Sequence, residues 1–195
     1  MNSNYHSRVG GNPSFLVSSV VNIFSIIIYR LPFIVYLCGM TDKHFMQMAI
    51  NKAYEGIELG QSPFAASIVK NDEVIACDHN IVLHSTDITA HGEIHAIRNA
   101  CKKINSIHLT GATIYSTCEP CPMCFTAIHW ARIKKIVYGL SIEDAAAYGF
   151  NELTVSNELM KTHGGSDIEL VPNFMREECI ELFEYWNKHP KKMVY

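Results

Sequence analysis

The feature that most constrains the fold is a regular alternation of helix and strand patterns from Met40 to the C-terminus. Helical patterns cover residues 42–59, 91–103, 120–132, 143–147, 152–161 and 175–187. Strand patterns cover residues 64–69, 74–76, 112–116, 133–139 and 168–171, and residues 80–83 extend the second strand. This alternation predicts an α/β fold, a three-layer α/β/α sandwich with a central mixed five-stranded sheet, as one domain over residues 40–195.

The first 39 residues differ from the rest of the chain. They contain no Asp or Glu, and 17 of the 23 residues from Phe15 to Leu37 are apolar. A membrane span would be interrupted by Arg30 and Pro32, and a signal peptide would lack an A-x-A-like cleavage site. A third interpretation is upstream DNA translated from a start codon assigned too early. We favour the third and expect residues 1–39 to be a hydrophobic extension, non-native or disordered, with no membrane contact unless residues 15–37 are native.

Two short segments carry the residues with metal-binding chemistry. The first is Ala90-His91-Gly92-Glu93, and the second runs from Cys118 through Glu-Pro-Cys-Pro-Met to Cys124. Cys121 and Cys124 lie three residues apart at a predicted helix start, where the helix dipole favours thiolates, and thiolates bind soft divalent metals. With His91 they form a three-ligand set, and catalytic zinc keeps its fourth position for water. Glu93 is then a general acid and base beside the metal, and not a ligand.

Two simpler interpretations of the cysteines compete with catalytic zinc. Cys121 and Cys124 could form a thioredoxin-like redox pair, but such a pair is expected in the first βα unit and without a partner H-x-E motif. Alternatively, Cys118 could be the fourth ligand of a structural zinc, which leaves Glu93 without a role. The joint occurrence of both motifs, each at a predicted helix start, favours a catalytic zinc ion (Zn²⁺).

These motifs match the H-x-E and P-C-x-x-C signature of zinc deaminases, and residues 41–195 resemble the cytidine deaminase-like superfamily, in particular bacterial guanine deaminases and their nucleoside deaminase relatives. The likeness extends beyond the two motifs to further segments. These are Ser62-Pro63-Phe64, Asn80, residues 127–132, residues 144–150, Trp186 and residues 192–195.

The resemblance implies a role for each candidate residue. His91, Cys121 and Cys124 would hold zinc, and Glu93 would carry protons. The substrate contacts would come from four further residues, namely Phe64 against the purine face, Asn80 as a hydrogen-bond partner, Asp144 at the exocyclic amine and Tyr195 closing the pocket. The resemblance also implies a homodimer in which the C-terminal tail is exchanged.

Each of the four substrate contacts has a plain structural alternative. Asn80 could only form a turn, and Phe64 could be a core aromatic. Asp144 could cap the helix that follows it, and Tyr195 could be a frayed chain end. His95 lies four residues after His91, and we expect it to be a supporting or core residue and not a ligand.

Charge helps to choose between substrates. Arg8 and Arg30 are the only strong cations in residues 1–39, so residues 40–195 carry 14 of the 16 Lys and Arg and all 19 Asp and Glu, a net charge of −5. This argues against a polyanionic partner such as tRNA. We therefore expect guanine deamination to xanthine and ammonia, with tRNA wobble-adenosine deamination or guanosine- or cytidine-type nucleoside deamination as alternatives. Thiolate ligands suit a reducing cytoplasm.

Overall fold

The computed structural model describes residues 41–195 of the chain. The predictions for residues 1–39, and the division of the chain at residue 40, concern a segment that lies outside the described residues.

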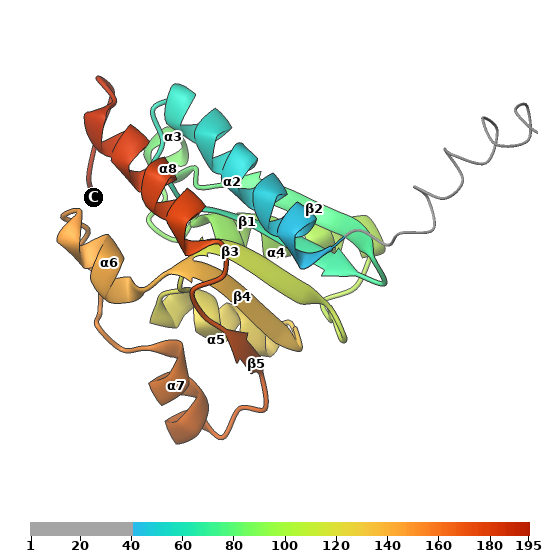
Figure 1. The fold of residues 1–195 in the computed structure, drawn as a ribbon. Helices are drawn as coiled ribbons and strands as arrows, with labels where there is room; N and C mark the ends of the chain where they lie inside the picture. Colours follow the sequence, from blue (N-terminus) through green and yellow to red (C-terminus); the bar gives the residue numbers. More distant parts are fainter. Residues whose placement is uncertain (1–40) are drawn as a thin grey trace, which may run out of the picture. The chain divides into compact units, whose positions relative to one another are not determined.

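One mixed sheet forms the centre of the fold (Figure 1). Its strands are β1 (Ala65–Lys70), β2 (Glu73–His79), β3 (Thr113–Cys118), β4 (Lys135–Leu140) and β5 (Glu169–Val171). They lie in the order β2-β1-β3-β4-β5. β1 runs antiparallel to both of its neighbours, whereas β3, β4 and β5 are parallel to one another. The predicted mixed five-stranded sheet is therefore confirmed.

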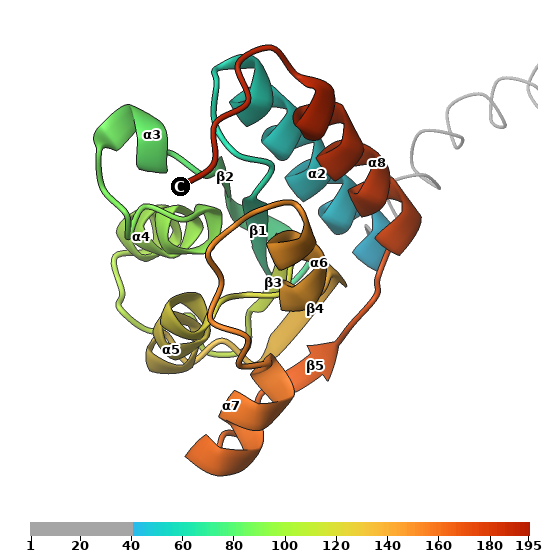
Figure 2. The ribbon, with the colours of Figure 1, turned by 90° about the vertical axis from the view of Figure 1, so that its left-hand side faces the viewer.

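Helices cover both faces of this sheet, as Figures 1 and 2 show. One face carries α2 (Asp42–Glu58) and α8 (Arg176–Lys188), with Met46 and Phe183 fully buried in its core. The opposite face carries α4 (Gly92–Ile104) and α5 (Pro122–Trp130), with fully buried Ile128 in the second core. The predicted three-layer sandwich is confirmed, because each amphipathic helix buries its apolar side against the sheet.

Three shorter helices follow strand ends or loops. They are α3 (Val82–Ser85), α6 (Ile142–Ala147) and α7 (Asn157–Gly164). α6 begins directly after β4 ends at Leu140, beside the end of the parallel strand β3 at Cys118. Parallel strands bring their carboxyl ends to one edge of the sheet, so the loops after β3 and β4 are neighbours.

Two predicted elements are wrong. Residues 80–83 do not extend the second strand, because the Asn80 side chain accepts a hydrogen bond from the Val82 amide and turns the chain into α3. The helix expected at residues 152–161 begins only at Asn157, where Ser156 caps it by accepting a hydrogen bond from the Leu159 amide. Residues 150–155 are therefore irregular.

Within residues 41–195, none of the helices combines the length and the apolar character needed to cross a bilayer.

Candidate active site

His91, Cys121 and Cys124 come together although the first lies 30 residues before the second. The His91 Nδ1 atom lies 3.6 Å from the Sγ atom of Cys121 and 3.6 Å from that of Cys124. One ligand atom from each of the three residues lies within 4.8 Å of the others. The structure thus assembles the three residues that the motifs single out.

The backbone explains this convergence. His91 is the N-cap of α4 and Cys121 is the N-cap of α5, both with extended backbone angles. Neither side chain makes a capping hydrogen bond to its own helix, so each is free to turn toward the other. Pro122 begins α5 without the loss of a hydrogen bond, since the first helical N–H has no partner inside the helix. Two helix N-termini, each with a partial positive charge, therefore meet at the cluster.

The charge state of the cysteines suits a metal. A hydrogen bond from the Cys124 thiol, helped by one from His91, lowers the pKa of Cys121 to about 4 despite burial. Burial and the neighbouring Cys121 raise the pKa of Cys124. A divalent cation reverses this second effect, because a coordinating thiol is deprotonated outright.

The distances between the ligand atoms fit zinc. A tetrahedral zinc site with Zn–N of about 2.1 Å and Zn–S of about 2.3 Å separates nitrogen from sulfur by about 3.6 Å. Both His91–cysteine separations have this value. One nitrogen and two sulfurs also match zinc chemically and leave one position of the tetrahedron free.

Glu93 lies directly behind the cluster and is 5% exposed. Ser116 donates a hydrogen bond of 3.2 Å to its Oε1 atom, and the Cys124 thiol lies 3.5 Å from Oε2. Burial raises the pKa of this carboxyl, while the nearby His91 opposes the shift. A raised pKa brings a carboxyl closer to the range that suits general acid–base catalysis.

Gly92 allows α4 to begin at this depth. A Cβ atom on Gly92 would lie 2.9 Å from the Ala65 Cα atom and 3.1 Å from the Phe64 carbonyl oxygen. The structure shows that β1 passes so close that a side chain here would push the strand and the helix apart.

A cavity of about 270 Å³ opens in front of His91 and Cys121. Its walls include Ile88, Phe150, Glu152 and Tyr195. Glu152 also borders the smaller inner cavity beside Glu93, and burial together with the neighbouring Cys121 raises its pKa to about 7.

Glu152 is absent from the candidates taken from the sequence. It falls inside the region interpreted as a helix from residue 152, where it looks like a surface acid. The signal that could have revealed it is the missing apolar periodicity of residues 151–156, which indicates a loop beside the motif segments.

Two of the four predicted substrate contacts, Tyr195 and Phe64, border the cavities. Asn80 borders neither cavity and reaches the site only through its contact with Tyr195. The Asn80 Nδ2 group donates a hydrogen bond to the Tyr195 hydroxyl, and the Tyr195 ring centroid lies 6.0 Å from that of His91. Phe64 borders the inner cavity and packs edge-on against Phe150. Asn80 thus forms its turn and also holds the Tyr195 hydroxyl, and Phe64 is both a core aromatic and part of the inner cavity wall. Tyr195 reaches the cavity of its own chain, so tail exchange remains a prediction.

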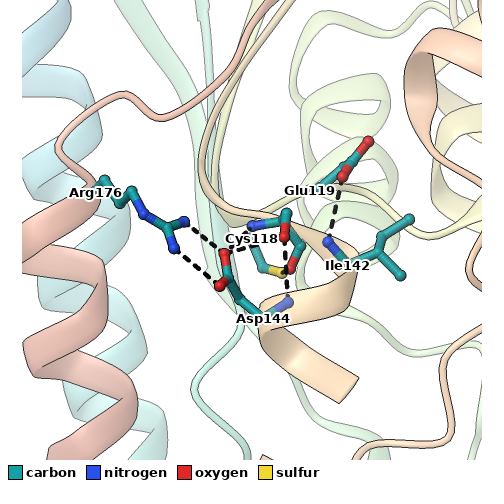
Figure 3. A network of polar contacts seen from close by, with 6 residues as sticks. Cys118, Glu119, Ile142, Asp144 and Arg176 are labelled. Atoms are coloured by element: carbon teal, nitrogen blue, oxygen red, sulfur yellow. Dashed lines mark hydrogen bonds and ion pairs between the residues drawn. The ribbon is translucent and has the colours of Figure 1, made fainter. Parts of the chain in front are cut away.

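Asp144 lies elsewhere. Its carboxylate forms a two-pronged ion pair with the guanidinium of Arg176, with N···O distances of 2.5 and 2.9 Å (Figure 3). It also accepts a hydrogen bond from the backbone amide of Ser141 and closes a capping box at the start of α6. Asp144 borders neither cavity at the cluster, so the placement favours the capping alternative.

His95 faces β2 and not the cluster. Its Nδ1 atom lies 3.2 Å from the His79 carbonyl oxygen and 3.8 Å from the Asp78 carboxylate. These contacts agree with the expectation of a supporting residue.

Similarity to known proteins extends over most of the described chain. The family model of the cytidine and deoxycytidylate deaminase zinc-binding region matches residues 40–140. The chain is 37% identical to the guanine deaminase of Bacillus subtilis (strain 168), over 80% of this chain and all of that one. It is 36% identical to the tRNA-specific adenosine deaminase of the same organism, over 71% and 83%. A solved tRNA A34 deaminase structure superimposes with a TM-score of 0.64 at 31% identity, over 72% of this chain and 99% of the other.

Proposed function

The chain belongs to the family of cytidine and deoxycytidylate deaminase zinc-binding domains and is a zinc-dependent aminohydrolase, and on this premise we propose that it hydrolyses guanine to xanthine and ammonia. The observation that carries the choice of a free base is the small cavity in front of the cluster, which the C-terminal Tyr195 borders. A volume of about 270 Å³ is near the lower end for ligand pockets and suits a small planar molecule.

The metal would be held by His91, Cys121 and Cys124, whose separations fit zinc. Zinc, when bound, lowers the pKa of water to about 7 and so supplies a nucleophile at neutral pH. In the proposed hydrolysis a water oxygen would add to C2 of guanine, and cleavage of the exocyclic C2–N bond would release ammonia.

The protons would be moved by the chain's own carboxyl groups. Glu93 takes a proton from the attacking water and delivers it to the adjacent ring nitrogen. It then passes a proton to the leaving amine. Its burial and its hydrogen bond from Ser116 hold it in one orientation. Glu152 borders both cavities, and its pKa of about 7 suits it to relay the one proton that the departing amino group needs to leave as ammonia.

The substrate would be recognised by the residues around the cavity. The Asn80 amide, which faces the Tyr195 hydroxyl, has a donor suited to the purine carbonyl. Phe64 and Tyr195 supply aromatic surfaces for a planar ring. Tyr195 borders the cavity, and its ring would cover the bound base.

Deamination of tRNA adenosine is the second candidate, because the chain is nearly as similar to a tRNA-specific adenosine deaminase as to a guanine deaminase. The net charge of −5 over residues 40–195 disfavours a polyanion. The similarity to the guanine deaminase also spans that entire relative. Guanosine or cytidine would require additional room for a ribose beside Tyr195.

A substrate panel tests the proposal. Ammonia release is measured with guanine, guanosine, adenine, cytosine, cytidine and a tRNA anticodon stem-loop, on full-length protein with zinc. We expect the largest kcat/KM for guanine. Turnover of the stem-loop alone would replace the proposal by its second candidate.

Replacing Tyr195 tests the cover. We expect Tyr195→Ala to raise the KM for guanine up to about ten-fold, because an aromatic contact with a bound base is worth about 0.5–1.5 kcal/mol, and to leave the unfolding temperature unchanged. Tyr185→Ala, which alters an exposed ring on α8, is the matched control. An unchanged KM would remove Tyr195 from the site.

A homodimer is part of the same proposal. Trp130 and Ile107 are 76% and 75% exposed and line one groove on the α5 side, which is the kind of apolar surface that subunits bury. Light scattering is expected to give twice the chain mass, and Trp130→Glu to give the monomer. A wild-type monomer would exclude both the dimer and the exchanged tail.

A further inference from the structure

Glu119 is a buried carboxylate with no role in the reaction proposed above. It lies two residues before Cys121 and is 6% exposed. Its Oε2 atom accepts a hydrogen bond of 3.2 Å from the Ile142 amide, which Figure 3 shows, and its Oε1 atom accepts one of 2.7 Å from the Asn157 amide. One carboxylate therefore caps the first residue of α6 and the first residue of α7.

These two bonds enclose the segment that carries Glu152. Residues 148–156 connect α6 to α7, and Phe150 to Leu153 line the main cavity. The first N–H groups of a helix have no partner inside the helix, so an external acceptor decides where the helix begins. Glu119 thus holds both ends of an irregular segment against the turn that leads to Cys121.

Asn157 strengthens the attachment at the far end. Its Nδ2 group donates a hydrogen bond of 2.6 Å to the Pro120 carbonyl oxygen, and the residue is fully buried. The segment is therefore joined to the Glu119–Pro120 dipeptide by a side chain as well as by two backbone amides.

We propose that Glu119 is a positioning residue that holds Glu152 toward the cavity by capping α6 and α7 together. This rests on the proposed function, in which Glu152 moves a proton. Glu119 also borders the inner cavity beside Glu93 and Glu152, but both of its carboxylate oxygens are engaged by the two helix amides. A shift of about 1 Å in a reacting group can reduce the rate by about a hundred-fold, so the capping carboxylate controls turnover through the position of Glu152.

Glu119→Gln tests this with little change in volume. The amide can accept only one of the two N–H groups and turns its own NH₂ toward the other. We expect kcat/KM for guanine to fall at least ten-fold with the zinc content per chain unchanged. Glu143→Gln is the matched control, because Glu143 is an exposed acid in the first turn of α6, and it is expected to change kcat/KM less than two-fold.

The double variant separates positioning from general stability. If Glu119 acts through Glu152, then Glu119→Gln costs less than about two-fold once Glu152→Gln is present, because interacting sites are non-additive. A full additional loss in the double variant, or loss of zinc from Glu119→Gln alone, overturns the proposal.

Hydrogen exchange provides a readout that does not depend on activity. The amides of residues 150–156 are expected to exchange faster in Glu119→Gln, while those of α4 keep their wild-type rates. If Glu119→Gln does not fold, Asn157→Ala replaces it in the same measurements. This variant removes only the hydrogen bond to Pro120, so we expect a smaller increase in the exchange rates of residues 150–156. If the wild type releases no ammonia from any substrate, the proposed function fails, and exchange alone decides. Faster exchange supports the capping role, and unchanged exchange excludes it.

Discussion

The N-termini of α4 and α5 differ in kind from those of α6 and α7. α4 and α5 begin with His91 and Cys121, which make no capping hydrogen bond to their own helices. α6 and α7 begin with Ser141 and Ser156, whose hydroxyl groups accept hydrogen bonds from the first turn. Serine is a preferred N-cap, and its loss typically costs about 1 kcal/mol. The starts of α4 and α5 give up that stability so that their side chains can meet in a metal-ligand geometry.

Two carboxylates show the same contrast. Glu93 is almost fully buried beside the cluster, and burial raises its pKa. Asp144 is paired with Arg176, which, together with Ser141, lowers its pKa. A carboxyl with a raised pKa can exchange protons, whereas a carboxylate held by a guanidinium stays charged and holds helices together. This contrast supports the proposed proton-transfer role of Glu93 and favours a structural role for Asp144.

The largest effect is expected from replacing the non-capping Cys121 at the start of α5 with a capping serine. Cys121→Ser supplies a good N-cap but no thiolate. We expect zinc to fall from about one ion per chain to a trace, deamination to fall below detection, and the unfolding temperature of the zinc-free protein to stay the same or rise. Cys101→Ser on α4 is the control and should keep both zinc and activity. Retention of zinc by Cys121→Ser would contradict the assignment of Cys121 as a ligand.

Next comes the buried carboxyl group. Glu93→Gln is expected to lower kcat by about 10²–10⁴-fold, the range for removal of a general acid–base group, and to leave the zinc content intact. Ser116→Ala removes only the hydrogen bond to Glu93 and should cost far less. Steady-state ammonia release and metal analysis of the same samples check both. Normal turnover by Glu93→Gln would end the proton-transfer proposal.

A smaller, purely structural effect is expected at the paired carboxylate. Asp144→Asn should lower the free energy of unfolding by about 2 kcal/mol, because it weakens a charge-assisted pair and a capping box, and should change kcat/KM by less than about two-fold. Urea unfolding and guanine kinetics give the two numbers, with Glu143→Gln as control. A large loss of activity at unchanged stability would return Asp144 to the substrate site.

The same pair predicts how stability depends on pH. The folded state lowers the pKa of Asp144, so the contribution of the pair is complete above the unfolded value of about 3.9. It is lost as pH falls below that value toward the folded pKa. The stability difference between wild type and Asp144→Asn should therefore be constant near neutral pH and shrink in acid. A difference that grows on acidification would contradict this sign.

The smallest effect is expected at the cap of α7. Ser156→Ala should cost about 1 kcal/mol of stability and change kcat/KM by less than about two-fold, because Glu119 and Asn157 still hold the start of α7. Urea unfolding and kinetics on one preparation measure both. A ten-fold loss of activity would mean that Ser156, and not Glu119, is the main anchor of residues 150–156.

Much of the fold could be predicted from the sequence because its signals are local. Asn71 and Asp72 indicate a turn by residue type alone, because Asn and Asp tolerate the positive φ angles of 52° and 60° found there. Pro122 likewise indicates a helix start, because proline is favoured at the first helical position. The late start of α7 could not be predicted, because the carboxylate that caps Asn157 comes from Glu119, 38 residues earlier in the chain.

The sequence by itself determined where α4 and α5 begin and that a mixed sheet lies between the helices, because capping preferences and periodicity act within a few residues. Only the tertiary structure decided which carboxyl groups lie together. Glu152 reaches the cavity through an irregular segment, and Asp144 is turned toward Arg176, 32 residues further on. The physical reason is that a carboxylate takes its pKa and its partners from the elements that pack against it, and those partners are distant in the chain.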